Sequence, residues 1–379
     1  MRGLVLEGGG AKGAFHVGAL KALFEKGYAF DGVMGTSIGA MNGAMVAQGD
    51  FDLLFRLWNN ITPSAVLGLD DEYMSRLRER IDRDVIKYLW GELKKAVAER
   101  GLSTDKMEKM LDTYLDEDKL RASPIDYGVV TVDISDGWSP VEIFKDEMPY
   151  GTIKDYILAS AYFPAFRRKP LNGKKYMDGG IYDNMPINPL IRRGYDNITV
   201  IRTLSYMPHR KVIDKTVDIL YIKPSEPLGR TLDFSNEKIQ YKIKLGYYDC
   251  LRTLDGLKGK RYYVYAAEDA DYFGVMESLD YGVFEKLAKT EGMEDASKRQ
   301  ILAAMAKAMG ASDDNLAGVI LDWLEPYAEA YEMERFRLYS LEDFIKTLLA
   351  QVKKLGVERI GERKDLDHKK RFMALNNLT

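Results

Sequence analysis

Short apolar runs alternate with amphipathic segments over the first 50 residues of the chain. Residues 3–6 form an apolar run that ends at Glu7 and three glycines, which is typical of a buried parallel strand. Residues 13–26 carry apolar positions at helical spacing, and Gly27 is a suitable stop. Residues 31–35 predict a second short strand. A helix of small side chains over residues 38–48 completes an alternation that favours an α/β fold with a parallel sheet.

The alternation is interrupted and then resumes. Residues 51–122 are charge-rich and mostly helical in pattern, so we interpret them as a helical, cap-like insertion. Its predicted helices lie near residues 51–60, 72–100 and 104–115. The later part of the α/β pattern predicts strands at 127–134, 140–145, 197–203 and 217–223, and helices near 152–160 and 187–193.

The pattern of hydrophobic and polar residues changes again near residue 230. Residues 235–256 and several stretches between 283 and 356 have the pattern of amphipathic helices, and residues 357–379 resemble a polar tail. We therefore predict a catalytic domain over residues 1–230 and a mostly helical C-terminal extension over residues 231–379.

Composition and charge exclude several classes of protein. Of the 379 residues, 46% are hydrophobic and 30% are charged, which is the profile of a globular protein. The net charge of −3 argues against a general nucleic-acid binder, which needs a basic face. A single cysteine, Cys250, allows no internal disulfide, and no Cys/His cluster has zinc spacing. Neither a secretory signal nor an apolar run of about 18–20 residues is visible, so we expect a cytoplasmic protein.

The glycine loop after the first strand allows three interpretations. Gly8, Gly10 and Gly13 satisfy the spacing G-x-G-x-x-G of a dinucleotide site, but the second strand ends without the acidic residue that such a site requires. The loop is no P-loop, because Lys12 precedes Gly13 and no Ser or Thr follows it. The other interpretations are a tight turn and a nest of backbone N–H groups that stabilises a developing oxyanion.

A nucleophile elbow follows the second predicted strand. Gly35–Gly39 fits G-x-S-x-G between a strand and a helix, a setting that holds the serine on a sharp, strained turn. Ser37 is therefore the candidate nucleophile, and it needs a base.

Three histidines compete for the role of that base. His209 would suit the order Ser, Asp, His of α/β-hydrolases, but in that fold the serine follows several strands and here it follows two. His16 lies inside the first predicted helix, where a packed histidine is the simpler interpretation, and His368 lies in the tail.

A carboxylate is the better candidate for the base. Asp178 opens an Asp-Gly-Gly turn, and partial desolvation there would make it a stronger base than a free aspartate. Asp183 is the neighbouring competitor, although its Asn-x-Pro surroundings favour a role in loop architecture.

Together, these motifs resemble the patatin-like phospholipases over roughly residues 1–205. The resemblance rests on EGGGAKG (7–13), GTSIG (35–39), DGG (178–180) and three linking stretches, TVDISDG (131–137), ASAYFPAF (159–166) and DGGIYDNMPI (178–187). It implies a three-layer α/β/α fold with a mostly parallel central sheet, and a Ser37–Asp178 dyad that uses no histidine, metal or organic cofactor. It also implies an oxyanion hole made by Gly8, Gly9, Gly10, Ala11 and Lys12. Lys12 stands where the family most often has arginine, and lysine lacks arginine's planar fork.

The implied function is a serine lipid acyl hydrolase of the phospholipase A or lysophospholipase type. Alternatives are an acyltransferase that uses the same acyl-enzyme and a non-catalytic lipid-binding protein on the same scaffold. The expected partner is a lipid or acyl-ester substrate and no nucleic acid, while the oligomeric state stays open. The insertion 51–122 either faces the acyl chain and a membrane surface or is an ordinary amphipathic subdomain. Its candidate apolar contacts are Phe51, Phe55, Trp58, Tyr88, Leu89 and Trp90.

Overall fold

The computed structural model describes residues 1–64, 103–164, 166, 169–265 and 316–355. The chain divides into two compact units, Met1–Cys250 and Leu251–Thr379. The division falls within helix α11 (Asn236–Asp255), later in the chain than the change of pattern near residue 230.

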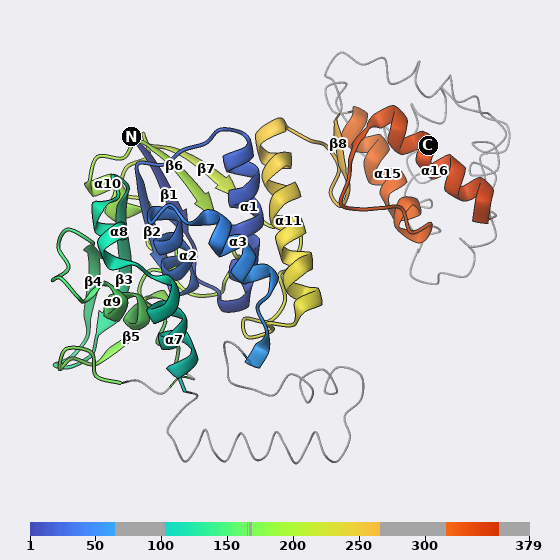
Figure 1. Cartoon of the computed structure of the whole chain (residues 1–379). Helices are drawn as coiled ribbons and strands as arrows, with labels where there is room; N and C mark the ends of the chain where they lie inside the picture. Colours follow the sequence, from blue (N-terminus) through green and yellow to red (C-terminus); the bar gives the residue numbers. More distant parts are fainter. Residues whose placement is uncertain (65–102, 165, 167–168, 266–315, 356–379) are drawn as a thin grey trace, which may run out of the picture. The chain divides into compact units, whose positions relative to one another are not determined.

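The first unit is built on a mostly parallel sheet of seven strands (Figure 1). The strands follow the order β4-β3-β2-β1-β6-β7, and β5 pairs with β3 beside this path. All neighbouring pairs are parallel except β3–β4 and β3–β5, which are antiparallel. Their bounds are β1 (Arg2–Leu6), β2 (Gly32–Thr36), β3 (Asp126–Asp133), β4 (Ser139–Phe144), β5 (Tyr176–Asp178), β6 (Asn197–Ile201) and β7 (Asp218–Ile222).

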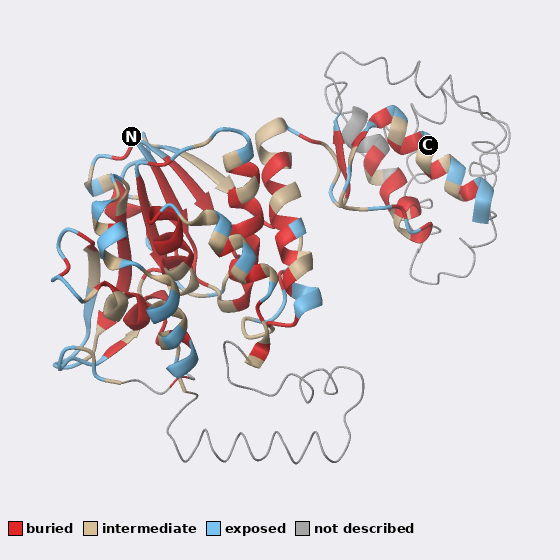
Figure 2. Ribbon diagram, viewed as in Figure 1, coloured by how far each residue is buried: buried red, intermediate tan, exposed pale blue. Residues whose placement is uncertain are grey.

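Helices cover both faces of this sheet. On one face, residues of β3 pack with the small side chains of α2 (Ile38–Ala47), with α8 (Glu117–Ala122) and with α9 (Ile153–Ser160). On the other face, Val5, Met34 and Val200 pack with Leu190 of α10 (Asn188–Arg192). The strands between these layers are largely buried (Figure 2), as parallel strands are in α/β proteins. The predicted three-layer α/β/α architecture is confirmed.

The strand register brings two distant segments to one point of the sheet. β2 occupies one edge of β3 as far as the pair Thr36–Val130. β5 takes over the same edge at the next residue of β3, where Thr131 pairs with Asp178. The chain leaves β2 at Ser37, so Ser37 and the end of β5 meet at the carboxyl edge of the sheet.

Parts of the predicted helical insertion lie within the described residues. The helices expected near 51–60 and 104–115 are confirmed as α3 (Phe51–Asn59) and α7 (Asp105–Tyr114). The helix expected over 72–100, with Tyr88, Leu89 and Trp90, lies outside the described residues. In the part of the chain that the structure covers, no helix has both the length and the apolar character that crossing a bilayer requires.

The second unit contains helices in the region 283–356, as the sequence pattern predicted, and also a small sheet that it did not predict. Helices α15 (Leu316–Ala330) and α16 (Leu341–Leu355) accompany two parallel strands, β8 (Tyr263–Tyr265) and β9 (Leu338–Ser340). The buried carboxylate of Glu325 accepts hydrogen bonds from the backbone N–H groups of residues 260–262. This contact ties α15 to the segment that leads into β8.

Candidate active site

Ser37 occupies a strained turn between β2 and α2. Its backbone has φ 56° and ψ −123°, a region that non-glycine residues rarely adopt. Gly39 allows the turn, because a Cβ at that position would overlap the carbonyl oxygen of Leu6 on β1. The Ser37 N–H donates to the hydroxyl of Ser160 at 2.9 Å, which fixes the turn against the end of α9. The Ser37 backbone therefore has the geometry expected of a nucleophile elbow.

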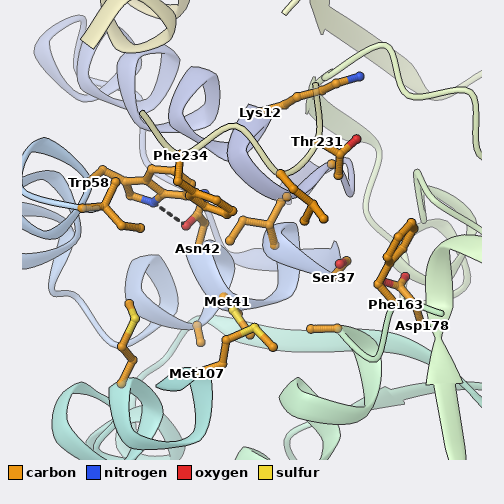
Figure 3. A pocket seen from close by; sticks show the side chains of 18 of the residues that line it. Lys12, Ser37, Met41, Asn42, Trp58, Met107, Phe163, Asp178, Thr231 and Phe234 are labelled. Carbon is orange, nitrogen blue, oxygen red and sulfur yellow. Dashed lines mark hydrogen bonds between the residues drawn. The ribbon is translucent and has the colours of Figure 1, made fainter. Parts of the chain in front are cut away.

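Asp178 ends β5 and is buried with 4% of its surface exposed. Burial raises the pKa of its carboxyl from the usual 3.8 to about 6, while hydrogen bonds from the Gly180 N–H and the Ser37 side chain act to lower this pKa. The Gly180 N–H lies 2.7 Å from Asp178 Oδ1. Ser37 and Asp178 both line one cavity, and Figure 3 shows their side chains near each other at its wall.

No histidine is found among the described residues that line this cavity. His16 is fully buried in α1 (Ala14–Glu25), where burial lowers its pKa to about 3 and Asn42 Nδ2 lies 3.3 Å from its Nδ1. His209 lies in an exposed loop after β6. His368 lies outside the described residues. Asp178 is thus the titratable side chain placed beside Ser37.

The competing carboxylate of Asp183 has a different position. It is buried and does not line the cavity, and its Oδ1 accepts the N–H groups of Met185 and Arg210, both at 3.2 Å. Its carbonyl oxygen accepts the Thr36 hydroxyl at 2.9 Å. Burial raises the pKa of this carboxyl to about 6 as well. These contacts hold the loop behind β2 in place and leave Asp183 away from Ser37's cavity.

The backbone N–H groups of the glycine loop differ in their hydrogen-bond partners. The N–H of Gly8 is bonded to Asn184 O, that of Ala11 to Thr231 O and that of Lys12 to Gly9 O. Gly9 and Gly10 line the cavity, and their N–H groups have no hydrogen-bond partner within the described part of the chain. Of the five residues predicted for the oxyanion hole, these two both line the cavity and have N–H groups that no described residue engages.

The Lys12 side chain is buried and cannot form the paired hydrogen bonds that an arginine could form at this position. It points away from Ser37 in Figure 3. Burial lowers the pKa of the ammonium group, and the negative charge of Glu7 acts in the opposite direction. The Lys12 ammonium group thus lies near enough to Glu7, at the start of the loop, for the two charges to attract each other.

Asn184 is a site residue that the sequence motifs did not identify. It lines the cavity and holds Gly8 through two hydrogen bonds. The Gly8 N–H donates to the backbone carbonyl oxygen of Asn184 at 3.1 Å, and Asn184 Nδ2 donates to Gly8 O at 3.2 Å. A Cβ on Gly180 would lie 2.7 Å from Asn184 Oδ1. Asn184 thus joins the glycine loop to the turn that follows Asp178. The signal in the sequence that could have identified Asn184 is its place in the stretch DGGIYDNMPI, six residues after Asp178.

The cavity beside Ser37 is apolar and has a volume of about 290 Å³. Residues of α2, α3 and α7 line it, and α3 and α7 belong to the predicted insertion over residues 51–122. Trp58 lies on this wall and donates to Asn42 Oδ1 at 2.9 Å, whereas Phe51 packs on Phe24 at 4.8 Å between ring centroids. The apolar residues from these helices are Ile38, Met41, Ala44, Met45, Leu54, Leu57, Trp58, Met107, Met110 and Leu111.

The segment before α11 also reaches the site, although no role was assigned to residues after 230 from the sequence. Thr231 and Phe234 line the cavity. The Thr231 carbonyl accepts the Ala11 N–H at 2.7 Å, and the Phe234 ring stacks on Trp58 at 6.3 Å. This segment therefore holds the glycine loop and closes one side of the cavity.

Comparison with known proteins places this architecture in a family. The family described as patatin-like phospholipase matches residues 4–191. The putative patatin-like phospholipase domain-containing protein M110.7 of Caenorhabditis elegans is 25% identical over 295 residues, covering 76% of this chain and 24% of that protein. Patatin-like phospholipase domain-containing protein 6 of Homo sapiens is 24% identical over 303 residues. The match covers 75% of this chain and 19% of that protein.

Two further proteins are similar over most of this chain. Lysophospholipase NTE1 of Candida glabrata is 24% identical, covering 76% of this chain and 15% of its own length. The structure of VipD from Legionella pneumophila aligns with a TM-score of 0.43 and 18% identity, covering 100% of this chain and 84% of that chain. The chain spans a quarter or less of the length of these curated relatives. Residues 4–191 of this chain form a patatin-like phospholipase domain.

Proposed function

We propose that this protein is a serine lipid acyl hydrolase of the phospholipase A or lysophospholipase type, with Ser37 as nucleophile and Asp178 as base. The observation that carries the proposal is the strand register. It sets a serine on a strained elbow and a buried carboxylate side by side, at the wall of an apolar cavity. Ester hydrolysis through an acyl-enzyme needs this combination of groups.

In the first step, the Ser37 hydroxyl attacks the ester carbonyl carbon and its proton passes to the Asp178 carboxylate. The carbonyl oxygen becomes an oxyanion that the N–H groups of Gly9 and Gly10 stabilise. The carbon–oxygen bond to the leaving alcohol then breaks, and Asp178 returns the proton to that oxygen. A pKa of about 6 suits both transfers, because a base is most effective when its pKa lies near the working pH.

In the second step, a water molecule attacks the acyl-enzyme. Asp178 accepts a proton from the water as its oxygen bonds to the carbonyl carbon, and the same backbone donors hold the second oxyanion. Cleavage of the acyl–Ser37 bond releases a fatty acid and returns the proton to the serine oxygen. These steps use only Ser37, Asp178 and the backbone of the glycine loop.

The cavity supports a lipid as the substrate. Its wall of methionine, leucine and aromatic side chains favours an aliphatic acyl chain and offers few partners to a polar one. Two alternatives follow from the same geometry. An acyltransferase would pass the acyl group from Ser37 to an alcohol other than water, so only its product differs. A purely lipid-binding protein would have no need of an elbow and a base with a raised pKa.

The proposal is tested by incubating the purified protein with phosphatidylcholine or lysophosphatidylcholine in mixed micelles and measuring free fatty acid by mass spectrometry. We expect release by the wild type, and equal release by His209→Ala, because the His209 side chain does not line the cavity. A new ester of an added alcohol, formed in place of fatty acid, would identify a transferase. If neither product forms and a fluorophosphonate leaves Ser37 unlabelled, the protein is not a serine acyl enzyme.

The oxyanion donors lead to a second prediction. Gly10 has φ +56°, and a Cβ there would overlap the carbonyl oxygen of Thr231. Gly10→Ala should therefore displace the loop and lower kcat by roughly 10²–10³-fold, the usual effect of losing one oxyanion donor. Gly27→Ala is the matched control, because Gly27 also has positive φ but a Cβ there meets no atom within 4 Å. Equal kcat values for the two variants would contradict this assignment of the donors.

A further inference from the structure

One loop both lines the cavity and faces outward. Residues Leu204–Lys211 follow β6, and we call this segment the mouth loop. Ser205, Tyr206 and Met207 line the cavity that contains Ser37. Leu204 is 40% exposed and Tyr206 is fully exposed, so two large apolar side chains project outward at the cavity. The mouth loop therefore connects the cavity wall beside Ser37 with the outer surface.

The outward position of Leu204 is maintained against backbone strain. Its φ is +49°, which is unfavourable for a leucine. The fully buried carboxylate of Glu7, at the end of β1, accepts the N–H groups of Thr203 at 2.7 Å, Leu204 at 3.2 Å and Ser205 at 3.3 Å. A buried carboxylate with three backbone donors is a strong anchor. The fold thus holds the exposed leucine in a conformation that the isolated loop would not favour.

Positive charge accompanies the apolar tip. Arg210 and Lys211 are exposed, and the mouth loop contains no acidic residue. The loop backbone is anchored here as well. The N–H of Arg210 donates to Asp183 Oδ1, and Asn188 Nδ2 donates to Lys211 O at 2.9 Å. The result is a segment, anchored by hydrogen bonds, that presents a leucine and a tyrosine next to Arg210 and Lys211.

We propose that the mouth loop binds an anionic lipid surface, with Leu204 and Tyr206 entering the interface and Arg210 and Lys211 meeting acidic head groups. Exposed apolar and aromatic side chains flanked by cations are typical of interfacial contacts. The proposal rests on the proposed function, because a lipid hydrolase must bring an ester out of a membrane to Ser37. A soluble protein partner would not require the apolar tip to border the cavity.

The test measures vesicle binding in the Ser37→Ala background, so that no lipid is consumed. Flotation with vesicles of phosphatidylcholine plus phosphatidylglycerol should show binding. Leu204→Ser combined with Tyr206→Ser should weaken it tenfold or more. Tyr150→Ser is the matched control, because this exposed tyrosine follows the antiparallel strand β4 and so lies at the opposite edge of the sheet. An equal loss in the control, or no loss in the double variant, would overturn the proposal.

A second pair of variants tests the charges. Arg210→Gln with Lys211→Gln should weaken binding to the anionic vesicles by about fivefold per charge, in line with the usual attraction of one cation to an acidic leaflet. It should leave binding to pure phosphatidylcholine unchanged. Lys215→Gln, an exposed lysine just before β7 at the amino edge of the sheet, should have no effect. Equal weakening on both kinds of vesicle would exclude a role for the charges.

The outcomes separate this proposal from the proposed function. Each variant is first compared with its parent by thermal unfolding, so that a misfolded protein is not scored. Fatty acid release from micelles without vesicle binding by the folded Ser37→Ala protein would retain the hydrolase and overturn the lipid-surface role. Vesicle binding that depends on Leu204 and Tyr206, without fatty acid release by the wild type, would retain the surface and overturn the hydrolase.

Discussion

Ser37→Ala is expected to reduce fatty acid release on the order of 10⁴–10⁶-fold, to the background of the assay. In the proposed mechanism the Ser37 hydroxyl is the attacking group, and loss of a serine nucleophile removes the covalent pathway altogether. Binding of lipid should persist, since the apolar wall of the cavity is unchanged. The measurement is fatty acid release by mass spectrometry, together with labelling by a fluorophosphonate, which should disappear.

Ser160→Ala is the matched control for this variant. The Ser160 hydroxyl accepts the Ser37 N–H at 2.9 Å, so its loss loosens the elbow without removing the nucleophile. We expect a decrease in kcat of about tenfold, the effect of one hydrogen bond, with fluorophosphonate labelling retained. Labelling of Ser37→Ala at another serine, with activity retained, would show that the nucleophile lies elsewhere.

Asp178→Asn is expected to lower kcat by roughly 10²–10⁴-fold, the usual contribution of a general base. An amide is nearly the same shape as the carboxyl and can still accept the Gly180 N–H, so the elbow should stay intact. Ser37 would then lack a proton acceptor. We therefore expect loss of turnover with little change in KM, measured on the same micellar substrates.

The raised pKa of Asp178 gives this prediction a pH signature. A base with a pKa of about 6 is protonated below that pH, so kcat/KM of the wild type should rise between pH 5 and pH 7 with a midpoint near 6. Asp183 has a similar pKa, which makes Asp183→Asn the matched control. The kcat/KM of this control should still rise with a midpoint near pH 6, provided the variant remains folded. If Asp183→Asn alone lost this rise in kcat/KM, Asp183 and not Asp178 would be identified as the base.

Stability should change in the opposite sense to activity. The native Asp178 carboxyl has a higher pKa than its unfolded form, so the native state binds more protons between about pH 4 and pH 6, and its stability falls as the pH rises through this window. Above pH 6 the full cost of a buried negative charge is present. Asp178→Asn removes that cost, and its thermal midpoint should exceed that of the wild type by a few degrees at pH 8 but not at pH 4.

The local pattern of hydrophobic and polar residues was sufficient to predict most helices and strands of the first unit. The apolar runs at residues 3–6 and 127–134, and the helical spacing at 13–26, indicate elements that the structure contains as β1, β3 and α1. These signals are local, because burial on both faces of a parallel strand demands an unbroken apolar run. The elbow was visible for a similar reason: a serine between two glycines after a strand can be accommodated by few backbone turns.

The sequence pattern favoured Asp178 as the base, but Asp183 and His209 were also compatible with it. Which of these side chains lies beside Ser37 depends on a register between strands far apart in the chain, in which β5 continues the edge that β2 leaves on β3. β5 has only three residues, too few to show a period. Burial, which raises the pKa of Asp178, is likewise a property of the assembled layers.

The remaining contacts of the site were decided by tertiary structure for the same reason. Gly9 and Gly10 differ from the other predicted donors because Asn184 O accepts the Gly8 N–H, Thr231 O accepts the Ala11 N–H and Gly9 O accepts the Lys12 N–H. Thr231 and Asn184 are distant in sequence from the glycine loop, and no local preference signals such pairings. The sequence determined which chemical groups this protein carries and on which elements, whereas packing of the layers determined which of those groups face Ser37.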